Sequence, residues 1–472
     1  MYNLIVAHDR NYGIGLNGKL PWYFSKDMKY FSKLTRSNIH NIVVMGRNTW
    51  ESIPKSNRPL YNRVNIIIST KMSRKGLYDN VHVCRSFDEM ILLLKEMSKQ
   101  DTSVWFIGGP RIYKEALTRQ LISKLYVTFV HGTFECDTFL DPVLMSSFHT
   151  HKISSLTESN LDSTNKDGFH NKYLLEFREQ YLKTEENQYL DLIHKILVEG
   201  NIRKDRTGVG TKSIFGAQMR FSLRNNKIPL LTTKRVFFRG VVEELLWFLR
   251  GDTNVKNLQE KNVRIWDGNS TRGYLDSIGL TNYDEGELGP VYGFQWRHFG
   301  SKYKNCHTNY TGKGIDQIAT VIDLIKKNPT SRRIIFSAWN PVDLDKMALP
   351  PCHVLYQFYV NEGELSCSLY QRSGDMGLGI PFNIASASVL TYILAHICDL
   401  KPGELIHTIG DAHVYLNHIE GVTTQIKRVP RAFPNLHIIN DEASRTVETL
   451  TYKHFVLTDY NPMKSIRMKM AV

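Results

Sequence analysis

Apolar and polar positions alternate in short blocks over roughly the first 180 residues. Short apolar runs typical of buried strands are separated by stretches with apolar residues at helical spacing. This alternation indicates an α/β domain built on one sheet. The last strands follow one another with little helix between them, which predicts an antiparallel edge. The predicted strands are residues 3–8, 41–45, 64–69, 81–84, 103–107, 125–130 and 172–177, and the predicted helices are residues 24–34, 87–97 and 111–117.

The pattern changes at residue 188, after a stretch at 154–172 in which polar residues become more frequent. Longer apolar and amphipathic stretches follow, which favours an α+β domain with a large core. A chain of 472 residues is long for one core, so we predict domains at 1–178 and 188–472, joined by a short charged junction at 179–187. The predicted helices of the second domain are residues 188–198, 241–249, 315–325 and 385–397, and its predicted strands are 334–338, 353–360 and 365–370.

Charge and cysteine content narrow the class of protein. The formal net charge is +14, but the basic residues are dispersed and no nucleic-acid motif accompanies them, so small anionic ligands are favoured and nucleic-acid binding is at most a weak side activity. Six irregularly spaced cysteines predict neither a disulfide framework nor a metal site. The chain begins without a targeting segment, and its longest apolar run, 385–397, is too short to cross a membrane. We therefore expect a cytoplasmic protein.

Three turns in the first domain each follow an apolar strand, at residues 13–18, 45–54 and 108–110. The last opens a predicted helix, whose free backbone N–H groups favour a pyrophosphate. The second adds a basic side chain and two hydroxyls near a helix start. Each turn alone fits an ordinary loop, but three on one sheet predict a nucleotide stretched across the strand ends.

Asp27 lies on the apolar side of its predicted helix, with Phe24, Phe31 and Leu34 at helical spacing. A carboxylate in that position either finds a partner or takes a raised pKa. The simpler interpretation is a solvated charge at the edge of the apolar stripe.

Taken together, these segments resemble dihydrofolate reductase in order and across the whole first domain. The resemblance implies a mixed, mainly parallel sheet flanked by helices, with NADPH as hydride donor and dihydrofolate as substrate. Asp27, supported by Thr138, would hold the pterin and, with a water near Trp22, favour protonation of N5. The matching segments are residues 14–22, Asp27, 45–50, 107–109 and 137–139.

The same resemblance assigns the remaining residues of this site. Arg63 would pair with the folate α-carboxylate. Thr70 stands where many relatives place a basic residue that grips the 2′-phosphate, so Arg47 or Lys71 is expected to replace it. The dihydrofolate residues would be Trp22, Asp27, Met28, Leu60, Arg63 and Thr138. The NADPH residues would be Ala7, Ile14, Gly46, Arg47, Asn48, Thr49, Ser69, Gly108, Gly109 and Tyr113.

Cys352 is the strongest candidate nucleophile of the second domain. It stands between a diproline and His353, and Arg372, twenty residues later, is expected to lower its pKa. A lone cysteine is otherwise a small buried hydrophobe. Further arginines in motif-like settings suit a phosphate. Glu244 lies in a helix too apolar for the surface, so it is either buried with a partner or a candidate for proton relay.

The second domain resembles thymidylate synthase from about residue 188 to residue 472. The resemblance implies that Cys352 adds to C6 of dUMP and that C5 then attacks the methylene of 5,10-methylenetetrahydrofolate. Proton abstraction, elimination and hydride transfer release dTMP and dihydrofolate. Glu244 would organise the water relay, with Tyr292 near the C5 proton. The matching segments are residues 205–208, 246–254, 289–293, 331–333, 349–353, 371–375, 381–383 and 410–415.

The resemblance also assigns the substrate residues of the second domain. Four arginines would clamp the phosphate, Asn383 would read the uracil edge, and His413 and Tyr415 would hold the ribose. In this family two of the arginines come from the other subunit, so a homodimer through the second domain is implied. The dUMP residues would be Arg206, Arg332, Arg333, Arg372, Ser373, Asp375, Asn383, His413 and Tyr415, and the folate residues would be Trp266, Asp267 and Asp375.

Three functions remain open at this point. The first is a bifunctional enzyme, in which the second domain makes the dihydrofolate that the first domain reduces. The second is a synthase whose first domain only binds or regulates. The third is an RNA-binding protein, which the dispersed charge makes a side activity at most.

Overall fold

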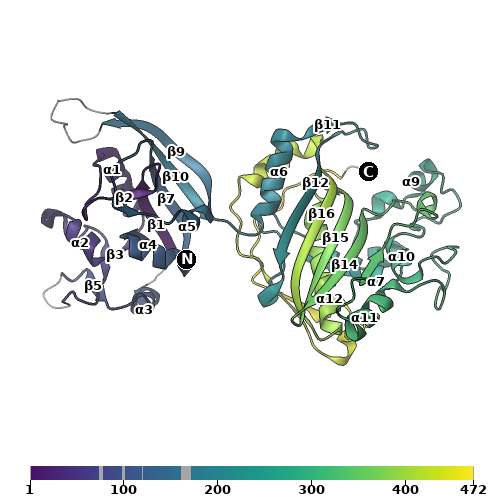
Figure 1. Cartoon of the computed structure of the whole chain (residues 1–472). Helices are drawn as coiled ribbons and strands as arrows, with labels where there is room; N and C mark the ends of the chain where they lie inside the picture. The colour runs from purple at the N-terminus through teal and green to yellow at the C-terminus, as the bar shows by residue number, and fades with distance from the viewer. Residues whose placement is uncertain (1, 74–77, 98–100, 120, 161–171, 471–472) are drawn as a thin grey trace. The chain divides into compact units, whose positions relative to one another are not determined.

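The computed structural model describes residues 2–73, 78–97, 101–119, 121–160 and 172–470 (Figure 1). It divides into two compact units, Met1–Lys183 and Thr184–Val472. The division lies inside the stretch that we predicted as a junction. That stretch is largely structured, because strand β10 continues to Leu182 and helix α6 begins at Asn187.

The first unit is an eight-stranded sheet in the order β5-β4-β3-β6-β1-β7-β10-β9. All neighbours are parallel except that β10 runs antiparallel to β7 and β9, as the pattern predicted. The strands are β1 (Tyr2–His8), β3 (His40–Gly46), β4 (Val64–Ile68), β5 (Val81–Cys84), β6 (Thr102–Gly108), β7 (Ile122–Val130), β9 (Phe148–Asn160) and β10 (Lys172–Leu182). A separate small sheet pairs β2 (Gly13–Gly15) with β8 (Thr138–Phe139).

Helices cover the sheet of the first unit on both faces. Successive residues of β3 point to opposite faces, so Val44 packs into one apolar cluster and Val43 and Met45 into another. Strands buried on both faces read as continuous apolar runs, which is why most were predicted. Strand β9 was not predicted, because its sequence is largely polar and it lies at the edge of the sheet. The helices are α1 (Ser25–Leu34), α2 (Arg47–Ser52), α3 (Phe87–Met97), α4 (Pro110–Thr118) and α5 (Pro142–Ser146).

The second unit contains a six-stranded sheet in the order β11-β12-β16-β15-β14-β13, visible side by side in Figure 1. Only β15 and β16 are parallel neighbours. The long strands β12 and β16 were not predicted, because one side of each carries mostly polar residues. The strands are β11 (Asn201–Arg203), β12 (Thr211–Ser222), β13 (Ile335–Ser337), β14 (His353–Asn361), β15 (Glu364–Asp375) and β16 (Lys401–Tyr415), with β17 (Asn435–Ile438) and β18 (Phe455–Thr458) in a second, two-stranded sheet.

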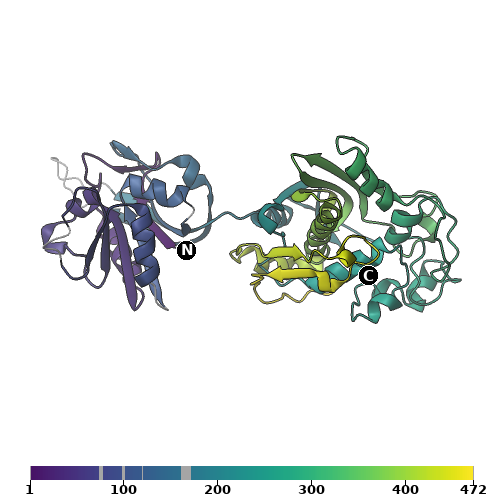
Figure 2. The ribbon, with the colours of Figure 1, turned by 90° about the horizontal axis from the view of Figure 1, so that it is seen from below.

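Helix α12 fills the centre of the second unit, and Figure 2 shows it enclosed by the other elements. It begins six residues before its predicted start, because Pro381 lies in the first turn, where a missing N–H costs nothing. By length and composition it could span a membrane, but most of the helix is buried inside the unit, as in the core helix of a globular domain. The helices are α6 (Asn187–Glu199), α7 (Phe238–Leu249), α8 (Lys256–Gln259), α9 (Arg272–Ser277), α10 (Tyr292–His298), α11 (Gln317–Lys327), α12 (Gly379–Ile397) and α13 (Ile419–Ile426).

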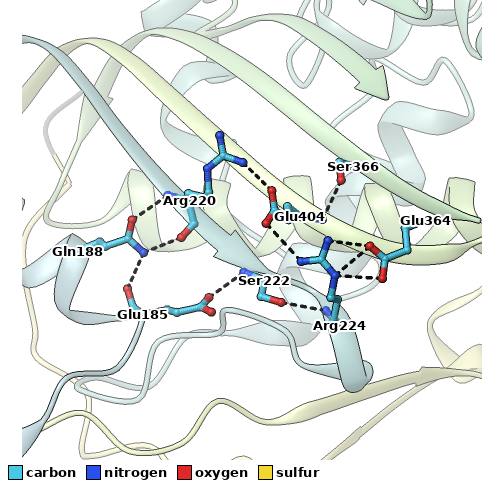
Figure 3. Close-up of polar contacts among 8 residues, drawn as sticks. All are labelled: Glu185, Gln188, Arg220, Ser222, Arg224, Glu364, Ser366 and Glu404. Carbon is cyan, nitrogen blue, oxygen red and sulfur yellow. Dashed lines mark hydrogen bonds and ion pairs between the residues drawn. The ribbon is translucent and has the colours of Figure 1, made fainter. Parts of the chain in front are cut away.

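The residues that lead into α6 are fixed to the second unit by polar contacts (Figure 3). The Glu185 carboxylate accepts the Ser222 N–H at 2.8 Å, and Gln188 exchanges two hydrogen bonds with the backbone of Arg220 at 2.6 and 2.9 Å. Arg220 also pairs with Glu404 at 2.5 Å. The network continues through Arg224, Glu364 and Ser366.

Glu186 is the most deeply buried residue of this lead-in. Its two carboxylate oxygens accept four hydrogen bonds, from the backbone N–H and the hydroxyl of both Thr232 and Thr233, at 2.6 to 2.8 Å. Burial raises its pKa even though these four bonds oppose the shift. The end of the predicted junction is therefore part of the core of the second unit.

Candidate functional sites

A cavity of about 750 Å³ lies at the carboxyl ends of β1, β3, β4 and β6 in the first unit. All ten residues that the sequence assigned to a dinucleotide line this one cavity. Arg47 and Lys71, the expected substitutes for a basic residue at Thr70, line it as well. Arg85 also lines it and was missed by the sequence analysis.

The glycines of this cavity are needed for their size. A Cβ on Gly108, whose φ is +129°, would meet the Thr49 hydroxyl at 3.2 Å, and one on Gly46 would meet Ile112 at 3.3 Å. Helix α4 follows with Gly109 at its N-cap, Pro110 at its first position and no side-chain cap. The Ile112 and Tyr113 N–H groups donate to the Gly109 carbonyl. The close backbone around Gly108 and the positive end of the helix dipole fit a bound pyrophosphate.

Asp27 lies beside this cavity. Its carboxylate accepts a 2.6 Å hydrogen bond from the Thr128 hydroxyl on β7. Burial raises the pKa of Asp27 to about 6, and the Thr128 bond opposes that shift. Tyr113 also lines the cavity. Burial raises its pKa, and the negative charge of Asp27 adds a smaller increase.

The support predicted from Thr138 is wrong. The Thr138 hydroxyl donates to Asp137 at 2.7 Å, and its side chain lines the cofactor cavity. Thr128 takes its place at Asp27, 101 residues along the chain. The only signal for Thr128 in the sequence was a hydroxyl inside an otherwise apolar strand.

Two further residues of the predicted dihydrofolate site carry unsatisfied groups. Trp22 is 4% exposed, and its indole N–H has no hydrogen-bond partner among the described residues. Arg63 is 7% exposed and donates to the Thr35 hydroxyl at 2.8 Å, but it makes no ion pair in the described part of the chain. Burial and Arg36 lower its pKa to about 10. Met28 is exposed and Leu60 half-buried, as residues of an open apolar channel would be.

In the second unit, Cys352 immediately precedes β14 and is half-buried. Its N–H donates to the Tyr292 hydroxyl at 2.7 Å, and its carbonyl accepts the Arg372 N–H at 2.9 Å. The Arg372 guanidinium donates to the carbonyls of Pro351 and Pro350 at 2.9 and 2.8 Å. Arg372 thus positions the loop that carries the thiol.

The pKa of Cys352 reflects both the predicted effect of Arg372 and the burial of the thiol. Burial raises the pKa of the thiol, and this effect outweighs the lowering by Arg372, Tyr292 and Arg206. The arginines act in the predicted direction, but the sequence could not show how deeply the sulfur would be buried.

Glu244 faces the same site from α7. The Trp266 indole N–H donates to its carboxylate at 2.7 Å, and burial raises the pKa of Glu244 to about 7 against that bond. The rings of Trp266 and Tyr292 lie 6.1 Å apart. Asp267, by contrast, accepts from Gln259 at 2.9 Å.

The predicted ribose residues and Asp375 lie at the ends of β15 and β16. Asp375 accepts the N–H groups of Gly377 and Leu378 at 2.8 and 3.0 Å. Burial opposes its ionisation, but His418 and these bonds hold its pKa below the usual range. His413 lies 5.2 Å from the ring of Tyr415, whose hydroxyl is raised in pKa by burial and then by Asp375. Ser373 adjoins them on β15.

Arg332 and Arg333 are exposed in the loop before β13 and form no ion pair among the described residues. The charges that act on Cys352 within this chain are those of Arg372 and Arg206. The structure therefore does not bring the paired arginines to the thiol of their own chain.

These two sites are typical of an enzyme with two unlike centres, one a cavity that fits a dinucleotide and one the surroundings of a thiol. Residues 1–174 match the family model described as dihydrofolate reductase, and residues 187–472 match the one described as thymidylate synthase. The chain belongs to the family of bifunctional dihydrofolate reductase-thymidylate synthases. It is therefore an enzyme of thymidylate synthesis and dihydrofolate reduction, from families that use NADPH and methylenetetrahydrofolate.

The similarity to curated relatives extends over both units. The chain is 49% identical to the bifunctional dihydrofolate reductase-thymidylate synthase 2 of Arabidopsis thaliana, with all of this chain and 88% of that protein covered. It is 48% identical to the bifunctional enzyme of Paramecium tetraurelia, of which it covers 99%, and 45% identical to that of Leishmania major, of which it covers 95%. The similarity to these relatives therefore covers both the first and the second unit.

Proposed function

We propose that Cys352 is the nucleophile that adds to C6 of dUMP. The observation that carries this proposal is the position of Cys352. Its N–H donates to the Tyr292 hydroxyl, and Arg372 holds the loop before it. Tyr292 also feels the charge of the buried acid Glu244. The positive charges of Arg372 and Arg206 lower the pKa of the thiol and so favour the thiolate. Glu244, with a pKa near 7, would exchange protons with water at the pyrimidine, and Tyr292 would face the C5 proton.

For the reductase centre, Asp27 is the residue that would bind the pterin. A neutral or ionised carboxyl with a pKa near 6 can accept from the pterin N3 and 2-amino groups while favouring protonation of N5. The unpaired indole N–H of Trp22 would bind the water at that point. Arg63, a buried cation without a counter-ion, would take the α-carboxylate of the substrate.

NADPH would be held by the ten residues of the cofactor cavity. When bound there, it supplies the hydride for dihydrofolate. Lys71 and Arg47 would contact the 2′-phosphate, Arg47 after release from its 3.6 Å pair with Glu51. Methylenetetrahydrofolate would lie against Trp266, Asp267 and Asp375 in the second unit.

We expect the chain to act as a homodimer through the second unit. The face of its sheet opposite α12 exposes large apolar side chains, including Phe215 at 84% and Tyr359 at 67%. Exposed aromatic residues on a sheet face are typical of an interface. Arg332 and Arg333, which do not reach the thiol of their own chain, would reach that of the partner.

The test is a coupled assay with dUMP, methylenetetrahydrofolate and NADPH. Wild-type protein should form dTMP and tetrahydrofolate in one tube. Cys352→Ser should lose dTMP formation and keep the reduction of added dihydrofolate, whereas Asp27→Asn should do the reverse. If the wild type oxidised no NADPH on addition of dihydrofolate, the first unit would be a binding or regulatory domain instead.

Shared sites require a second experiment. Inactive Cys352→Ser and Arg332→Ala chains, mixed under conditions that exchange subunits, should regain part of the synthase activity, because one site of each hybrid dimer has both residues. No recovery after exchange has been verified by mass would exclude the shared site. We further propose that the enzyme acts in the cytoplasm.

A further inference from the structure

A chain of buried polar side chains leads away from Asn383, the residue proposed to read the uracil edge. Asn383 lies in the first turn of α12, Gln371 on β15 and His407 on β16. The Gln371 amide nitrogen lies 2.9 Å from Asn383 Oδ1, and Gln371 Oε1 lies 2.8 Å from His407 Nε2. Gln371 is 2% exposed and His407 is fully buried.

A backbone carbonyl shows which way the Gln371 amide is turned. The Gln371 amide nitrogen also lies 2.9 Å from the carbonyl oxygen of Ser373, which can only accept. The NH₂ group of Gln371 must therefore face Ser373, and its second N–H donates to Asn383. The group of Asn383 that receives this bond must be its oxygen, which leaves its own NH₂ group as a donor; the Asn383 side chain also hydrogen-bonds with His353.

The far end of the chain is set by His407. Because the Gln371 NH₂ group is used twice, its Oε1 is left to accept, and His407 must donate from Nε2. Burial, followed by the charge of His353, lowers the pKa of His407 to about 3, so the ring is neutral and carries a single proton. That proton is required on Nε2, which leaves Nδ1 as a bare ring nitrogen without a partner among the described residues.

The orientation of Asn383 has a chemical consequence. With its oxygen accepting and its NH₂ group donating, it matches a pyrimidine edge that offers N3–H as donor and O4 as acceptor, which is uracil. Cytosine offers the reverse, an acceptor at N3 and a donor at the 4-amino group. An Asn383 amide that rotated by 180° would lose this preference, since the two ends of an amide differ only in which atom donates.

We propose that His407 is a positioning residue for pyrimidine specificity: its Nε2–H and the Ser373 carbonyl hold the two ends of the Gln371 amide, and together they keep Asn383 in the orientation that selects dUMP over dCMP. This inference rests on the proposed dUMP site. His407 touches no substrate. It acts because a buried Gln371 oxygen without a donor would be costly, so the alternative amide orientations are disfavoured.

The experiment compares two substitutions of His407 in the full-length chain. His407→Phe keeps the ring and removes the donor, whereas His407→Gln keeps an N–H that can reach Gln371. Dissociation constants for dUMP and for dCMP are measured by calorimetry. We expect the preference for dUMP to fall roughly tenfold in His407→Phe and to recover to within about threefold of wild type in His407→Gln.

Ser388→Ala is the matched control. Ser388 is fully buried, like His407, and lies on the same helix as Asn383. Its hydroxyl donates to the Ile384 carbonyl at 2.8 Å and is not part of the amide chain. This variant should keep the wild-type preference. Reductase activity, measured on the same preparations, reports that each chain is folded in its first unit. If His407→Phe does not yield folded protein, His407→Met provides the same loss of a donor.

The possible outcomes distinguish a failure of the His407 proposal from a failure of the proposed dUMP site. An unchanged preference in His407→Phe, or an equal loss of dUMP and dCMP binding, would overturn the positioning role and leave the synthase site intact. Failure of His407→Gln to restore the preference would also count against it. Failure of the wild-type chain to bind dUMP would instead refute the proposed site itself.

Discussion

Replacing Asp27 by Asn should make the first unit more stable and less active at the same time. The pKa of this carboxyl is raised from 3.8 to about 6, chiefly by burial. At about 1.4 kcal/mol per pH unit, burial disfavours its ionised form by about 3 kcal/mol. Asn has no charge to bury, and its amide oxygen can still accept from Thr128.

The sign of the pH dependence follows from the raised pKa. Between about pH 4 and pH 6 the folded state binds more protons than the unfolded state, so wild-type stability decreases as pH rises through this window and stays lower above it. Asp27→Asn removes that dependence. At pH 7.5 the first unit of the variant should be more stable by up to about 3 kcal/mol, and near pH 4 the two should agree.

Urea unfolding of the full chain checks this, with hydrogen exchange of β7 peptides as the probe of the first unit. Turnover of dihydrofolate should fall at least about 100-fold, while NADPH binding is retained. Asp137→Asn serves as the control, because the Asn17 N–H and the Thr138 hydroxyl hold the pKa of Asp137 below its usual value. No gain in stability for Asp27→Asn at pH 7.5, or near-normal turnover, would refute the reasoning.

Three further predictions concern single contacts. Thr128→Val removes the bond that favours the ionised Asp27, so the inflection of the reductase pH–rate profile should move to higher pH. Glu244→Gln keeps an acceptor for Trp266 but cannot titrate, so synthase turnover should fall at least about tenfold and an inflection near pH 7 should vanish from its profile. Glu186→Gln replaces a carboxylate oxygen that accepts two of four buried bonds, so urea unfolding of the second unit should show a loss of about 2 kcal/mol.

Much of the first unit was predictable because its chemistry is local in the sequence. Strands buried on both faces are continuous apolar runs, and the turns that form the cofactor cavity follow them directly. The ten cofactor residues, which the resemblance to dihydrofolate reductase assigned, all line one cavity. The exchange of Thr138 for Thr128 has the opposite cause, because the partner of Asp27 depends on which strand lies beside α1, and no local pattern carries that information.

The second unit shows the same limit. Helix α7 was predicted from its apolar sequence, but β12 and β16 were missed, because most of their outer residues are polar, Phe215 being an exception, and their inner residues form the core. Arg372 lowers the pKa of Cys352 as predicted, but burial outweighs this effect, and the sequence does not indicate the depth of burial. The amide chain through Gln371 and His407 joins three elements and has no sequence signature.

The buried carboxylate of Glu186 determines where the two activities can be cut apart. A shortened chain beginning at Gln188, the predicted domain start, would keep every matched synthase motif and yet lack this acceptor. The hydroxyls and N–H groups of Thr232 and Thr233 would then face an emptied, dry site. A separately expressed synthase should therefore begin at or before Thr184. The last residues of the predicted junction thus belong to the synthase unit.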